Sequence, residues 1–147
     1  MMKRILLPLL LVLAVLQGCT EKRSFVVTGS AKHLAGKKVY LSLIDINALQ
    51  LVDSAKIAGN GTFRFRIKTS IPEFYQIRKT PEDFITILAS PGEKIMLDFP
   101  DSLLHSDYTV SGSDGSLKLK LLELRLAGTI KSLDSLTGIY NTLPADA

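Results

Sequence analysis

The pattern of apolar and polar positions divides the chain into three parts. Residues 5–16 are almost wholly apolar. From residue 25 onwards, apolar and polar residues alternate with a period of two, which is typical of half-buried strands. After residue 115 the period changes to steps of three and four, which is typical of an amphipathic helix. The pattern therefore predicts a β-rich domain followed by a helix, with a separate apolar segment ahead of both.

The alternating part holds seven or eight short candidate strands, separated by turns rich in Gly, Pro, Asn and Asp. The strand ranges that we expect are 25–31, 37–44, 51–58, 62–68, 74–78, 84–88, 94–99 and 108–110. Turns at intervals of about eight to twelve residues favour an antiparallel sheet, a β-sandwich or a barrel-like sheet. We predict a mostly β fold in a single domain over residues 25–143, with the helix at its C-terminal end.

The strongest local signal is the sequence Gly59-Asn60-Gly61. An Asn-Gly pair supplies the positive φ angles of a tight hairpin turn. Residues 51–58 and 62–68 are therefore predicted to pair as a hairpin. On its second strand Phe63 and Phe65 are expected to point to one face, and Arg64 and Arg66 to the other.

A helix is predicted over about residues 116–141. Its apolar stripe consists of Leu119, Leu122, Leu126, Ile130, Leu133 and Tyr140. Gly128 is expected to bend or divide it, because glycine costs about 1 kcal/mol relative to alanine in a helix. The favoured interpretation is that the stripe covers the open face of the sheet. The alternative is that it forms an exposed docking surface for a protein partner.

The first residues have the layout of an export signal. Lys3 and Arg4 precede the apolar run 5–16, which is shorter than the roughly 20 residues of a membrane span. The small Gly18 comes directly before Cys19. An uncleaved membrane stub with a chance cysteine is the alternative interpretation.

The ending Leu16-x-Gly18-Cys19 resembles the lipobox of bacterial lipoproteins. This resemblance implies that residues 1–18 are a signal peptide cut between Gly18 and Cys19. Cys19 would then be lipidated, and residues 19–24 would tether the domain to a membrane. Several buried acyl chains hold a protein firmly, since each methylene contributes about 0.8 kcal/mol.

Composition then restricts the function classes. Cys19 is the single cysteine, so this chain has no second thiol for disulfide exchange. The net charge of +4 falls to +2 without Lys3 and Arg4. That charge is too close to neutral to indicate a nucleic-acid partner.

Six short motifs together resemble one known family. They are Phe25-x-Val27-x-Gly29, residues 36–41 (GKKVYL), residues 52–55 (VDSA), Asn60-Gly61-Thr62-Phe63-x-Phe65, Pro91-Gly92-Glu93-x-Ile95 and Tyr108-x-Val110-x-Gly112-Ser113. In order and spacing they resemble the N-terminal domain of unknown function of Bacteroidetes thioredoxin-like lipoproteins, the thiol:disulfide interchange and AhpC/TSA-related proteins. In that family a thioredoxin-fold domain with a Cys-x-x-Cys motif follows the helix, and residues 1–147 contain no such motif.

The resemblance implies a non-catalytic, lipid-anchored accessory module, facing the periplasm, that binds or positions something. The alternative is the truncated N-terminal part of a thiol:disulfide oxidoreductase. Thr20 and Glu21 follow the cysteine where an aspartate at the second position would signal inner-membrane retention. We therefore expect the outer membrane rather than the inner. No cofactor is expected.

Residue types associated with catalysis or metal binding occur without the spacing that either requires. His33 and His105 lie far apart and lack neighbouring ligands, so no zinc site is predicted. His105, Ser106 and Asp107 are triad residue types, but three consecutive residues do not align as nucleophile, base and orienting acid. We expect a solvated turn there and no enzyme activity.

One surface hypothesis concerns cations. Arg64, Arg66 and Lys68 share a strand face, and Arg78 and Lys79 are expected on a neighbouring strand. Such a stripe could meet anionic lipid headgroups, lipopolysaccharide or an acidic partner. The alternative is the ordinary polar face of a sheet.

A second surface hypothesis concerns O-glycosylation. Ser54, Ser102 and Ser135 each follow an aspartate and precede an apolar residue. This pattern resembles the glycosylation sites of periplasmic Bacteroidetes proteins. A glycan requires a surface position, and Ser102 is the best placed, because the other two lie in a predicted strand and helix.

Overall fold

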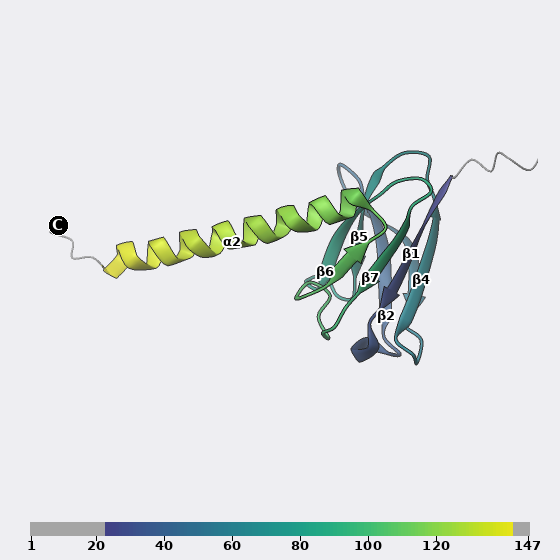
Figure 1. Ribbon diagram of the computed structural model, residues 1–147, viewed down its shortest axis with the longest axis horizontal. Coiled ribbons are helices and arrows are strands. Elements are labelled where there is room, and N and C mark those ends of the chain that lie inside the picture. Colours follow the sequence, from purple (N-terminus) through teal and green to yellow (C-terminus); the bar gives the residue numbers. More distant parts are fainter. Residues whose placement is uncertain (1–22, 143–147) are drawn as a thin grey trace, which may run out of the picture.

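The alternating apolar residues meet between two four-stranded sheets in the computed structural model, which describes residues 23–142 (Figure 1). The first sheet has the order β4-β1-β7-β8 and the second sheet the order β3-β2-β5-β6. The first sheet consists of β1 (Ser24–Ser30), β4 (Thr62–Lys68), β7 (Lys94–Asp98) and β8 (Thr109–Ser111). The second consists of β2 (Lys38–Ile44), β3 (Leu49–Lys56), β5 (Glu73–Arg78) and β6 (Phe84–Ala89).

A short 3₁₀ helix, η1 (Lys32–Leu34), follows β1, and the long helix α2 (Asp114–Thr142) follows β8. The predicted mostly β class with a C-terminal helix is confirmed. Every strand pair is antiparallel except β1 with β7, which is parallel. That exception was not predicted, because alternation along a strand carries no information on the direction of its neighbours.

Aromatic rings fill the space between the sheets. Phe25 on β1 contacts Tyr75 on β5 with ring centroids 4.8 Å apart, joining the two layers. Phe63 lies 5.7 Å from Phe65 and 6.2 Å from Phe99. All five rings are buried. Burial of this kind stabilises a fold by about 1.5–3 kcal/mol per large side chain.

The predicted hairpin is wrong as a pairing, although its turn forms. The amide of Gly61 donates to the Ala58 carbonyl and that of Ala58 to the Thr62 carbonyl, both at 2.9 Å. Gly61 has a φ of 85°, whereas Asn60 does not have a positive φ. The strands then separate, since β3 pairs with β2 and β4 pairs with β1. Pairing with β1 places the aromatic face of β4 against the core, and a turn by itself does not decide between such neighbours.

Helix α2 does not cover the open face of a sheet, so the favoured interpretation of its stripe is wrong. Its first turns contact β6 and β8, and the rest projects away from the sandwich (Figure 1). The Ser113 and Ser116 hydroxyls both donate to the Leu88 carbonyl, at 3.1 and 2.8 Å. These bonds fix the helix start at the sheet edge and direct the axis outwards. The helix also continues through Gly128 without interruption.

Within residues 23–142 no helix has both the length and the apolar character of a membrane span. The predicted signal peptide, its cut between Gly18 and Cys19, and the lipidation of Cys19 lie outside the described residues.

Candidate functional site

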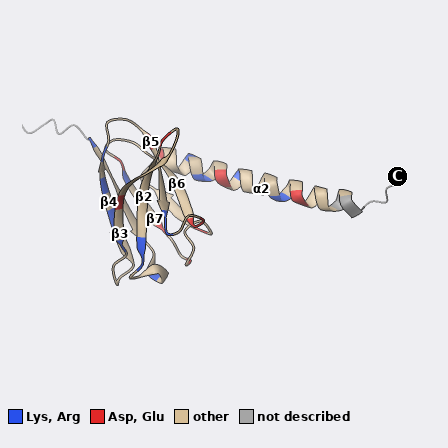
Figure 2. Cartoon of the chain, turned by 180° about the vertical axis from the view of Figure 1, so that it is seen from behind, with Lys and Arg blue, Asp and Glu red and all other residues tan. Residues whose placement is uncertain are grey.

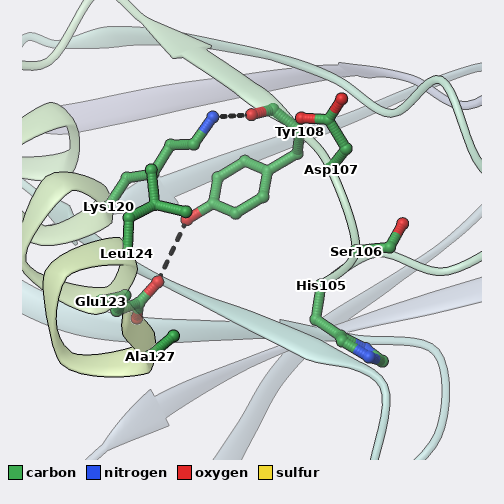
Figure 3. Close-up of a pocket in the computed structure, with 8 residues that line it drawn as sticks. All are labelled: His105, Ser106, Asp107, Tyr108, Lys120, Glu123, Leu124 and Ala127. Atoms are coloured by element: carbon green, nitrogen blue, oxygen red, sulfur yellow. Dashed lines mark hydrogen bonds between the residues drawn. The ribbon is translucent and has the colours of Figure 1, made fainter. Parts of the chain in front are cut away.

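The candidate site is a pocket where α2 leaves the sandwich (Figure 3). It has a volume of about 210 Å³. Loop residues between β7 and β8 form one wall, and the first turns of α2 form the other. The lining residues are His105, Ser106, Asp107, Tyr108, Lys120, Glu123, Leu124 and Ala127.

Tyr108 is the central side chain of this joint. Its hydroxyl donates to the Glu123 carboxylate at 3.3 Å, and its ring lies 4.6 Å from the Lys120 ammonium (Figure 3). Lys120 also donates to the Tyr108 backbone carbonyl. Burial, together with the carboxylate of Glu123, raises the pKa of Tyr108. Burial also raises the pKa of Glu123, and the hydrogen bond from Tyr108 offsets only part of this effect.

Asp83 fastens the loop that forms the other wall. Its carboxylate accepts hydrogen bonds from the Leu104 amide at 2.7 Å and from His105 Nδ1 at 2.9 Å. It also forms an ion pair with Lys79 at 2.7 Å. Burial raises the pKa of Asp83, but the bonds from Lys79, His105 and the backbone outweigh burial and hold that pKa below its usual range. The polar groups of the site thus engage one another, as in a structural joint.

The triad residue types do not form a triad. His105 pairs with Asp83 and not with Asp107, and Ser106 Oγ donates to Asp101 at 3.1 Å and to the Leu103 carbonyl at 3.2 Å. No hydrogen bond from Ser106 to His105 occurs, so the serine has no base beside it. In the described part of the chain no three His, Cys, Asp or Glu side chains gather as a metal site would require.

The described residues also form two exposed apolar surfaces. One is the outer face of the second sheet, defined by Ile44, Leu51, Phe74 and Phe84, each 38–60 % exposed. The other is the helix stripe, of which Leu122, Leu126, Ile130, Leu133 and Tyr140 are exposed. Exposed apolar areas of this extent are typical of interaction surfaces.

The predicted cationic residues separate into two groups. Arg64, Arg66 and Lys68 are exposed on β4 of the first sheet. Arg78 lies on β5 in the second sheet, so its predicted place beside β4 is wrong. Lys79 does not belong to the β4 group of cations either, because its ammonium pairs with Asp83 and donates to the Ser102 carbonyl. The two-layer fold, which the strand pattern does not specify, separates them.

The three predicted glycosylation serines are all exposed. Ser102 lies in the loop after β7, Ser54 on β3 and Ser135 on α2. Their surface positions satisfy the steric requirement for a glycan, and the modification itself stays a prediction.

Three residues that the sequence pattern did not single out contribute to these surfaces. Asp83 stood in a turn-rich segment and gave no sign of its contacts 21 residues away. Glu123 looked like an ordinary polar position of the helix. Lys94 starts β7, and only the strand order places it near β4.

A family model described as "Domain of unknown function (DUF4369)" matches residues 25–118, which cover all eight strands except Ser24, and the start of α2. A search of curated proteins found no match.

Proposed function

The chain belongs to the DUF4369 family, and we propose that its sandwich is a non-catalytic, lipid-anchored module that presents helix α2 to another protein. The observation that carries the proposal is the helix itself. It is 29 residues long, or roughly 43 Å at about 1.5 Å per residue. Beyond its first turns its leucines contact nothing within residues 23–142 that would bury them, and Leu122 is 62 % exposed.

The base of the helix is suited to holding it at a fixed angle. Its start is tied to β6 by two serine hydroxyls, and its second and third turns are tied to the β7–β8 loop through Tyr108. An isolated helix is marginal in water, and tertiary contacts usually supply most of its stability. A second protein that buries the stripe would supply the missing contacts.

The anchor half of the proposal is supported by the lipobox-like residues before Cys19. Strand β1 begins at Ser24, so the folded domain starts five residues after that cysteine. The proposed location is the periplasmic side of the cell envelope, on the outer membrane.

Lipidation is tested by expressing the chain from its native locus and measuring intact mass and membrane fractionation. We expect wild type to carry the mass of a chain cut before Cys19 plus its acyl chains, and to sediment with membranes. Cys19→Ala should lose both properties, while the matched neighbour Thr20→Ala should keep them. An unmodified, membrane-free wild-type product would exclude the anchor.

The helix is tested by placing a photoreactive benzophenone side chain at Leu126 or Leu133 and irradiating cells. We expect a cross-linked product of one discrete mass from both positions. Lys131, about 140° around the helix from Leu126, is the control and should give much less product. Equal yields from all three positions, or none, would exclude a specific partner on the stripe.

The second candidate is that α2 packs on a thioredoxin-fold domain of the same polypeptide, as part of a thiol:disulfide oxidoreductase. The family resemblance and the uncovered stripe favour it. The two candidates differ in the mass of the native product and in the DNA that follows codon 147. A larger lipidated product with a Cys-x-x-Cys motif would support the oxidoreductase.

A further inference from the structure

The outer face of the first sheet carries a cluster of cations. Alternation along β4 buries Phe63 and Phe65 and leaves Arg64, Arg66 and Lys68 exposed on the opposite face. Figure 2 shows the blue of Lys and Arg along β4. The exposed side of β4 is therefore positive over the length of the strand.

The strand register extends this cluster to β7. Val26 on β1 lies opposite both Arg66 and Lys94, so these three residues form one row across the sheet. Neighbouring strands are about 4.8 Å apart, which puts the Arg66 and Lys94 backbones roughly 10 Å apart. We define the cationic face as Arg64, Arg66, Lys68 and Lys94.

The cationic face is not neutralised by the domain. In the described range 23–142, none of its four side chains makes a hydrogen bond or an ion pair. The acid on the same side of β7 is Asp98, which lies opposite Ser30, four positions along β1 from Val26. Within the four strands of this sheet Asp98 is the one acid, so the four like charges leave a local positive potential that attracts anions.

One end of the cationic face, at Lys68, lies where the chain enters the sheet. Ser24 is the register partner of Lys68. Cys19 precedes Ser24 by five residues, which span at most about 17 Å when fully extended. A lipid on Cys19 would therefore hold the cationic face within reach of the bilayer surface.

We propose that the cationic face binds the anionic headgroups of the membrane that carries the anchor, which orients the sandwich with its first sheet towards the lipid. The inference rests on the proposed lipid anchor. Each lysine or arginine near an anionic surface gains about 1 kcal/mol of attraction, or roughly fivefold. The apolar outer face of the second sheet and the helix stripe then remain available to a protein.

The test is a lysine footprint of the full-length lipoprotein on vesicles. The protein is reconstituted into phosphatidylcholine vesicles with or without 30 mol % phosphatidylglycerol. It is then treated with an amine-acylating reagent, and the extent of acylation at each lysine is measured by mass spectrometry. We expect Lys68 and Lys94 to react about fivefold more slowly on the anionic vesicles. Lys38 and Lys56, exposed register partners in the second sheet, should react equally on both.

A pair of charge-reversal variants supplies the matched control. Arg64→Glu/Arg66→Glu should abolish the protection of Lys68 and Lys94, whereas Lys38→Glu/Lys56→Glu, with the same change in net charge, should keep it. Equal reactivity of Lys68 and Lys94 on neutral and anionic vesicles would overturn the proposal. Protection of all four lysines alike would overturn it too.

The experiment distinguishes a failure of the proposed lipid anchor from a failure of the proposed binding by the cationic face. Flotation with purely neutral vesicles measures the anchor alone, since the cationic face has no attraction for them. A protein that does not float there refutes the lipid anchor, and its lysine footprint on anionic vesicles still reports on the face.

Discussion

At Asp83 a single carboxylate joins two loops that are distant in the sequence. It accepts from the amide of Leu104 while pairing with Lys79 in its own turn. Its side chain is 6 % exposed, so these partners replace water almost entirely. Charged groups buried in this way depend on their partners, because an unpaired one is costly.

Asp83→Asn should lower the free energy of unfolding by about 2 kcal/mol at pH 7. The folded-state pKa of Asp83 is lower than its unfolded value. Its contribution is therefore present above the unfolded value of about 4 and is lost as the pH falls through the folded pKa. Urea unfolding of wild type and variant at pH 7 and below pH 4 should show the difference shrinking. The exposed Asp107→Asn is the control and should change stability by less than about 0.5 kcal/mol.

Gly112 is a second residue whose replacement should destabilise the domain, because its backbone conformation and surroundings suit only glycine. Its φ is 78°, and an added Cβ would lie 1.9 Å from the Lys94 carbonyl oxygen. Gly112→Ala should destabilise the domain by about 3 kcal/mol, combining left-handed strain with a backbone clash. Gly59→Ala, which meets nothing within 4 Å, should be nearly neutral in the same thermal unfolding experiment. Equal midpoints for the two variants would contradict this account of Gly112.

At the scale of elements, α2 combines a fixed base with a distal part that lacks contacts. Ser113 caps its start by accepting from the Ser116 amide at 3.2 Å. Beyond the pocket, the side chains of residues 128–138 are exposed on all sides. Helix propensity therefore governs the distal turns more than packing does.

Gly128→Ala should stabilise those turns by about 1 kcal/mol, because alanine is the better helix former and its Cβ meets nothing within 4 Å. Helical circular dichroism should increase, and exchange of amides near residue 128 should slow. The unfolding midpoint of the sandwich should stay unchanged. Ala127→Gly should have the opposite effect on the helix signal, and a helix signal indifferent to both substitutions would contradict the prediction.

At the scale of the whole molecule, stability should be unevenly distributed. The sandwich encloses a continuous aromatic and aliphatic core, whereas the distal helix has no such support. The two sheets also differ in their outer faces: the first carries the cationic face, and the second carries exposed apolar residues beside Lys38, Lys56 and Arg78. This asymmetry fits the proposal that one face meets a membrane while the other meets a protein.

Hydrogen exchange should show this unevenness directly. Amides of α2 beyond Ala127 should exchange at least about 10³-fold faster than those of β1, which opens only with global unfolding. Addition of a partner that binds the helix stripe should remove most of the difference. Strong protection of the distal helix in the isolated protein at high dilution would contradict the prediction.

The sequence alone determined the strand segments, the helix and the mostly β class, because alternation and helical periodicity are local properties of burial. It also indicated the exposed positions of Arg64 and Arg66, which follow from the buried Phe63 and Phe65 between and beside them. Only the tertiary structure decided that β3 and β4 part into different sheets, that Lys94 joins the cationic face, and that α2 leaves the sandwich. Those features depend on which strands pair and on bonds between residues such as Ser116 and Leu88, 28 positions apart. A local sequence pattern does not predict these long-range contacts, because they depend on the packing of the whole core.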